Sequence, residues 1–213
     1  MGSPAAADGF SDMAGHSADQ TNAKSLRGLK IATAGFVLLG VGIVLLPWAS
    51  ILYILAGVFV IPPGFILALS GLWVFRSNYA TTSPGRHAMM PVGLAVSLTG
   101  WLSSLSPDAN YPVRDSLLLI GFLLLAWGYV SFRADYRRKM HPRQVGLDSF
   151  LIGLSVVLVA FLVFAAGQFD AVFELHDPIA AVVTSLVGLG WLFVAVGTQQ
   201  LKRGFSKSPD AFK

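Results

Sequence analysis

The sequence predicts an all-α protein, a polytopic transmembrane bundle of six helices, and three observations support this prediction. Of the 213 residues, 54% are hydrophobic and only 12% are charged, about half the charged share of a soluble domain. Long segments carry no charged side chain, and basic residues gather between them. A soluble fold could not cover its surface with so few ionic groups, whereas a lipid-facing surface needs none.

The first uncharged segment is long enough to cross a membrane twice. Residues 31–75 carry no charge, and one helix of that length would measure about 67 Å at ~1.5 Å per residue. Because the hydrocarbon core is only ~30 Å thick, the segment must reverse. The favoured turn is at Pro47–Ser50, since proline lacks an N–H and disfavours helix before it. A turn at Pro62–Gly64 would leave too short a second span.

The polar segments divide the chain into a membrane domain, residues 24–203, and two tails. Residues 1–23 are small and polar and are predicted to form a disordered cytoplasmic tail, and residues 204–213 a second one. The third span is the weakest because serine and threonine dilute it, and these hydroxyls are expected to bond to their own helix or face neighbouring helices. The predicted spans are 29–47, 51–75, 88–105, 116–132, 149–167 and 179–199.

The charges predict the orientation. In a six-span arrangement every basic residue except Arg114 falls on one side, which the positive-inside rule makes cytoplasmic. We therefore expect a multi-pass protein of the cell membrane with both termini in the cytoplasm. Asp115 and Asp148 lie at helix starts, where a capping role is favoured over a functional one.

The strongest basic cluster lies between the fourth and fifth spans. Each such residue near anionic lipid contributes about 1 kcal/mol, so lipid anchoring and topology explain the cluster. A membrane-protein partner or a second copy of the chain is an alternative; nucleic acid is not expected, because no platform of stacking aromatics is visible. The predicted anionic-lipid surface comprises Arg133, Arg137, Arg138, Lys139 and Arg143.

Three glycine-led segments align without gaps and predict three tandem helical hairpins. They begin at Gly35, Gly93 and Gly153, and the glycines are expected to permit close helix packing. Chance similarity is the alternative to a true triplication, because glycine, leucine and valine are common in any span. A tryptophan also follows each aligned glycine on the returning helix: Trp73, Trp127 and Trp191.

This hairpin pattern resembles the HdeD-like acid-resistance membrane protein family over about residues 29–202. The resemblance implies a non-enzymatic role in membrane stress tolerance, without catalytic residues to transfer. Pro62-Pro63 and the long polar N-terminal segment depart from the family's pattern. The residues that carry the resemblance are Gly35, Gly42, Pro47, Gly57 and Gly71, with weaker echoes at Gly93, Gly100 and Gly153.

The sequence offers few groups for chemistry. It has no cysteine, and its four histidines, including His87 and His176, fall in predicted tails or loops. No ionisable residue lies near the middle of a span, which argues against proton-coupled transport, and no histidine is placed to hold haem. Nucleotide-binding and hydrolase motifs are also missing, so neither catalysis nor a cofactor is expected.

One acid–imidazole cluster occupies the last outer loop. Its carboxylates and imidazole could bind a divalent cation, whereas the alternative is a solvated acidic loop. An enzyme acting at the outer face through the same residues is the least favoured function. The candidate residues are Asp170, Glu174, His176 and Asp177.

Pro62, Pro63 and Gly64 predict a helix kink inside the second span. The prolines remove two N–H donors, so other helices, hydroxyls or water must satisfy the freed carbonyls; the kink serves packing or acts as a hinge. The sequence thus predicts a non-catalytic multi-pass membrane protein, stress-related or an accessory component. The alternative is a transporter or channel for a neutral or lipid-like substrate, lined by this kink and the third span.

Overall fold

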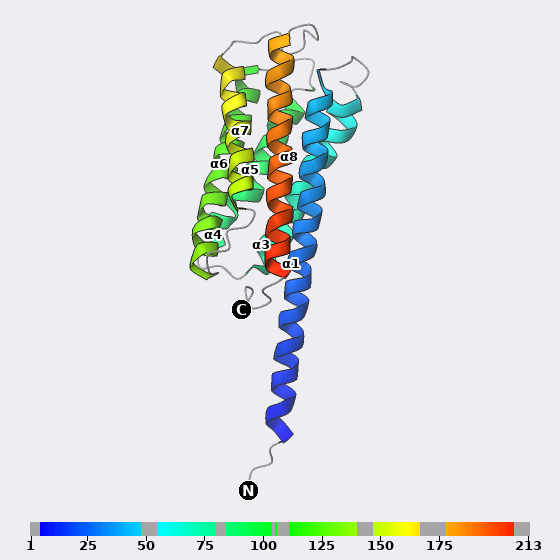
Figure 1. The fold of residues 1–213 in the computed structure, drawn as a ribbon, viewed down its shortest axis with the longest axis vertical. Coiled ribbons are helices and arrows are strands. Elements are labelled where there is room, and N and C mark those ends of the chain that lie inside the picture. The colour runs from blue at the N-terminus through cyan, green and yellow to red at the C-terminus, as the bar shows by residue number, and fades with distance from the viewer. Residues whose placement is uncertain are drawn as a thin grey trace.

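The structure, a computed structural model, describes residues 5–47, 55–79, 84–103, 105, 111–139, 147–166 and 178–206. Within these ranges the protein is an all-α bundle, as predicted, and its long helices lie side by side (Figure 1). The elements are α1 (Ala5–Leu45), the π-helix η1 (Leu55–Val60), α3 (Ile61–Asn78), α4 (Pro84–His87), α5 (Met89–Ser103), α6 (Tyr111–Lys139), α7 (Leu147–Ala166) and α8 (Pro178–Ser206).

Four helical segments are long and apolar enough to cross a membrane: Ala23–Leu45, Leu55–Asn78, Pro112–Tyr136 and Ala181–Ser206. Two further helices are shorter. The apolar part of α7 is Asp148–Val163, and α5 has 15 residues. The N–H of Val92 donates to the carbonyl of Ala88 at 3.1 Å, so the helical bonding of α5 extends back toward α4.

Two helices extend beyond the predicted boundaries. The segment 1–23 was expected to be disordered, yet α1 is helical from Ala5; its alanines are strong helix formers, and no proline follows Pro4 to interrupt them. The fourth span was placed at 116–132, yet α6 runs from Tyr111 to Lys139. The first reversal falls between Leu45 and Leu55, which encloses the predicted turn.

The helices pair into three antiparallel hairpins, α1 with α3, α5 with α6, and α7 with α8. The aligned glycines lie against equivalent backbone atoms in each. A Cβ on Gly93 would lie 2.5 Å from both the Gly121 carbonyl oxygen and the Leu125 nitrogen. A Cβ on Gly153 would meet the carbonyl of Gly190 at 2.5 Å. Gly35 likewise faces the carbonyl of Gly64 and the nitrogen of Ala68.

Each returning helix carries a second glycine seven residues after the first. These glycines also face equivalent atoms: Gly128 lies against the nitrogen of Met90 and Gly197 against that of Phe150, both at 2.5 Å from the built Cβ, and Gly71 lies against the nitrogen of Ala32. Three hairpins therefore share one register. This agreement supports a repeated unit over chance similarity. The glycine pairs of the returning helices are Gly64 and Gly71, Gly121 and Gly128, and Gly190 and Gly197.

The tryptophans do not follow this register. Trp73 comes two residues after Gly71, and Trp127 immediately precedes Gly128. These two side chains are 53% and 63% exposed, whereas Trp191 is fully buried. The predicted alignment of the three tryptophans is therefore wrong, and only Trp191 belongs to the core.

The hairpins close into a ring through three seams: α3 with α5, α6 with α7, and α8 with α1. Only the last is packed through facing glycines, since a Cβ on Gly188 would lie 2.8 Å from the carbonyl oxygen of Gly40. Leucine or proline stands at the corresponding positions of the other seams and keeps their backbones further apart. Those residues are Leu98 and Pro62 at the α3–α5 seam, and Leu158 and Leu119 at the α6–α7 seam.

Side-chain contacts stabilise the α3–α5 and α6–α7 seams, whose backbones lie further apart. Between α6 and α7, Tyr129 and Phe150 stack with ring centroids 4.1 Å apart. Between η1 and α5, the indole N–H of Trp101 donates to the carbonyl of Gly57 at 3.2 Å. In a π-helix that carbonyl would accept from residue i+5, which is Pro62 and has no N–H. Helix type changes from π to α between Val60 and Ile61, just before the predicted kink residues Pro62, Pro63 and Gly64. A neighbouring helix satisfies the Gly57 carbonyl.

Replacing Trp101 with phenylalanine should show how much this hydrogen bond contributes to the stability of the bundle. The aromatic ring is retained, but the Gly57 carbonyl loses its donor, which costs about 1–3 kcal/mol when the acceptor is buried. Thermal unfolding in detergent should show the lower midpoint. Trp127→Phe, at an exposed position, should leave the midpoint unchanged; equal midpoints for the two variants would contradict the assignment.

Candidate functional site at the basic end of the bundle

The three returning helices converge on a central axis filled by large side chains. Phe65, Phe122 and Trp191 follow the first glycine of each returning helix and are buried. The Trp191 ring centroid lies 6.4 Å from that of Phe65 and 5.9 Å from that of Phe122. Ala68, Leu125 and Val194 form the next layer and are fully buried. These layers leave the axis occupied by apolar groups.

A larger aromatic cluster closes the axis where α3, α6 and α8 finish, which we call the basic end because Arg76 and Arg203 occupy the last turns of α3 and α8. Each returning helix again contributes equivalent, buried residues. Ring centroids within the cluster lie between 5.3 and 5.9 Å apart for most contacting pairs. The aromatic members are Phe75 and Tyr79, Phe132 and Tyr136, and Phe205, while Leu201 of α8 occupies the position equivalent to Phe75 and Phe132.

A buried acid–imidazole pair lies against this cluster. Nε2 of His87, in α4, is 3.1 Å from Oδ2 of Asp135, in α6. His87 is 2% and Asp135 6% exposed. The imidazole stacks on Tyr79 at 6.0 Å and meets Phe132 edge-on at 5.9 Å. His87 was predicted to lie in a loop, but it is the last residue of α4 and its side chain is buried in the bundle.

Tyr79 supplies a hydroxyl to the same region. Burial raises the pKa of Tyr79, and the Asp135 carboxylate and Tyr136 raise it further. The phenol therefore stays protonated at neutral pH and remains a hydroxyl beside the pair.

The three repeats allow an internal comparison of this pair. Leu29 stands at the position of His87 in the first repeat, and Asn78 stands at the position of Asp135. In the third repeat the position of Asp135 is taken by Gly204. Packing of this layer thus does not require ionisable groups, and the second repeat alone pairs a histidine with an aspartate there.

The residues predicted to bind a cation, Asp170, Glu174, His176 and Asp177, lie outside the described part of the chain. Among the residues that are described, no group of three or more histidine, cysteine or acidic side chains is placed to hold a metal ion.

The predicted anionic-lipid surface is described only at Arg133. Its Nη2 donates to Oδ1 of Asp148 at 2.6 Å, across the α6–α7 seam. Asp148 lies in the first turn of α7, as its predicted capping role requires. The side chains of Arg137, Arg138 and Lys139, and all of Arg143, lie outside what the structure describes.

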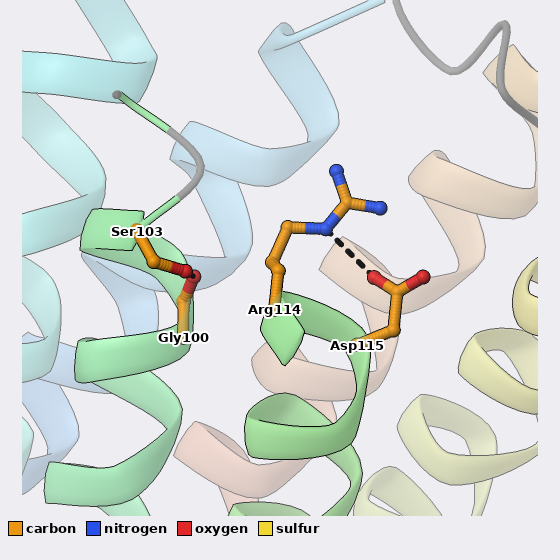
Figure 2. Close-up of polar contacts among 4 residues, drawn as sticks. All are labelled: Gly100, Ser103, Arg114 and Asp115. Carbon is orange, nitrogen blue, oxygen red and sulfur yellow. Dashed lines mark hydrogen bonds and ion pairs between the residues drawn. The ribbon is translucent and has the colours of Figure 1, made fainter. Parts of the chain in front are cut away.

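The opposite end carries a second arginine–aspartate contact. Figure 2 shows Nε of Arg114 donating to Oδ1 of Asp115 at 2.7 Å, beside the end of α5 where the Ser103 hydroxyl donates to the Gly100 carbonyl. Asp115 was predicted to cap its helix. That prediction is wrong, because α6 begins at Tyr111 and its first turn has no acidic residue.

The hydroxyls of α5 do not converge on a common path. Thr99 is exposed and donates to the Ala95 carbonyl at 3.0 Å, while Ser103 donates to the Gly100 carbonyl at 2.7 Å, so both bond to their own helix as expected. Ser97 instead is buried between α5 and Gly121 of α6.

The geometry of the basic end can hold two opposite charges inside the bundle and can respond to their protonation. Comparison with protein-family models, with curated proteins and with solved structures finds no match to this chain.

Proposed function

We propose that this chain is a non-catalytic multi-pass protein of the cell membrane, a stress-related or accessory component that acts through helix packing and partners. The observation that carries the proposal is the filled axis, where Phe65, Phe122 and Trp191 pack on one another and Ala68, Leu125 and Val194 complete the apolar layers. A bundle with this interior suits a scaffold better than a conduit. The resemblance to the HdeD-like family supports a role in stress tolerance.

We further propose that the chain crosses the membrane six times with the basic end in the cytoplasm. Arg76 ends α3, Arg203 lies in the last turn of α8, and Arg133 lies near the end of α6. This placement agrees with the positive-inside rule. Anionic lipid is the proposed ligand of the basic cluster from Arg133 to Arg143, and a membrane-protein partner or a second copy of the chain would bind the apolar exterior.

Transport measurements test the proposal directly. Protein reconstituted into vesicles should leave both glycerol permeation and the transbilayer movement of a fluorescent phospholipid at the rate of protein-free vesicles, because the axis is occupied. The same vesicles, examined with protease at engineered terminal tags, report the orientation. Saturable movement of either probe above the protein-free rate would contradict the scaffold proposal and support the transporter alternative.

A further inference from the structure

We infer that His87 and Asp135 form a proton-dependent latch that holds α4, in the connection between the first and second hairpins, against the basic end of the bundle. The inference goes beyond the proposed function and does not depend on it. It rests on the contact of 3.1 Å between His87 Nε2 and Asp135 Oδ2, and on the burial of both side chains.

The latch joins α4 to the ends of α3 and α6. α4 consists of Pro84–His87, and within it Gly85 and Arg86 are exposed. His87 is thus the described side chain by which α4 enters the core. It reaches Asp135 on α6 and stacks on Tyr79, the residue that follows α3, so this single side chain contacts the ends of two returning helices.

Groups that face the pair or its aromatic neighbours come from several described elements. From the end of α3 comes Tyr79, from α6 come Phe132 and Tyr136, and from α8 comes Phe205, which carries no titratable group and packs on Tyr79 and Tyr136. On α4 itself the neighbouring Arg86 is exposed. α5 begins with Met89 and Met90, which do not titrate.

The charges set the direction of the response. With His87 protonated and Asp135 ionised, the two charges neutralise each other inside an apolar layer, which is the condition a buried charge needs. When rising pH removes the imidazole proton, the buried carboxylate faces a neutral ring. When falling pH protonates Asp135, the imidazolium faces a neutral acid. Either change weakens the contact, so α4 is held most firmly between the two titrations and is released on each side of them.

The chain supplies its own control. Changing His87→Leu and Asp135→Asn together reproduces the Leu29 and Asn78 of the first repeat, a pair without ionisable groups at the same layer. Gly85 is the reporter position, because it is exposed and a Cβ there meets no atom within 4 Å. Since the chain has no cysteine, a Gly85→Cys variant carries a single thiol. That thiol is labelled with a nitroxide at one fixed pH, before the pH is varied.

The experiment compares the mobility of this label, by electron paramagnetic resonance, from about pH 5 to about pH 9, the range over which an ordinary histidine changes charge. With the native pair, the mobile fraction should rise by a factor of about two or more toward the alkaline limit. With the paired Leu and Asn variant it should stay constant. A constant spectrum with the native pair, or the same pH response in both proteins, would overturn the latch.

A second variant covers the case in which the paired change prevents folding. Asp135→Asn alone keeps the shape of the side chain and removes the carboxylate, so its label should show a high mobile fraction with a smaller alkaline change than the native pair. Gel filtration and thermal unfolding of each labelled protein establish that the bundle is intact. An intact Asp135→Asn protein with an unaltered pH response would also refute the inference.

Discussion

Replacing Gly71 with alanine should destabilise the bundle by roughly 1–3 kcal/mol or more. The new Cβ would collide with the backbone nitrogen of Ala32 and approach the carbonyl oxygen of Gly28 at 2.6 Å. Backbone cannot rotate away as a side chain can, so α1 and α3 would have to move apart along their length. Thermal unfolding in detergent, followed by circular dichroism, should show the fall in midpoint.

The control for this change is Gly57→Ala, in the same hairpin. A Cβ at Gly57 would meet only the ends of Leu46 and Trp101 side chains, at 3.9 and 4.0 Å, which is ordinary contact. The equivalents Gly128 and Gly197, each with a backbone nitrogen 2.5 Å from the built Cβ, should respond as Gly71 does. If Gly71→Ala unfolds at the temperature of Gly57→Ala, the proposed helix contact does not exist.

Replacing Trp191 with alanine should have the largest effect of any single truncation, about 3–5 kcal/mol. The indole is fully buried and lies against Phe36, Phe65 and Phe122 from three different helices. Its removal would leave a cavity on the axis that these neighbours cannot fill without losing contacts with each other. Unfolding in detergent should report both the lower midpoint and a less cooperative transition.

Trp127→Ala is the matched comparison, because it removes the same side chain from a position that is 63% exposed. Most of that side chain stays in contact with lipid or detergent in the folded protein. Its removal should therefore lower the free energy of unfolding by less than about 1 kcal/mol. A larger loss at Trp127 than at Trp191 would mean that the axis is not the core of the bundle.

The all-α class and the three hairpins could be predicted because they follow from local properties. A charge-free segment such as 31–75 fixes its own helical state and its need to reverse, whatever the rest of the chain does. The aligned glycines Gly35, Gly93 and Gly153 indicated which faces meet. Helix ends were less predictable: α6 extends beyond 116–132 at both ends, because polar residues such as Arg133 and Asp135 continue the helix by pairing with other elements.

The buried pair could not be predicted from hydropathy, since His87 and Asp135 are distant in sequence and each alone looks like a loop residue. The sequence nevertheless contains a pattern that places Asp135 beside the core. Phe75-Arg76-Ser77-Asn78-Tyr79 recurs as Phe132-Arg133-Ala134-Asp135-Tyr136. Each motif begins four residues after the second glycine of its returning helix, Gly71 or Gly128. Alignment of the returning helices on this motif would have corrected the misplaced tryptophans and brought Asp135 into the core layer.

The glycine contact between α1 and α8 has a consequence for biosynthesis. Gly40 is made early and Gly188 late, yet only their meeting closes the ring of hairpins. During translation the first hairpin therefore enters the bilayer before α8 is made. Until α8 arrives, lipid chains cover the face of α1 that carries Gly40. Insertion of α8 is therefore the step that expels those lipids and closes the ring of hairpins.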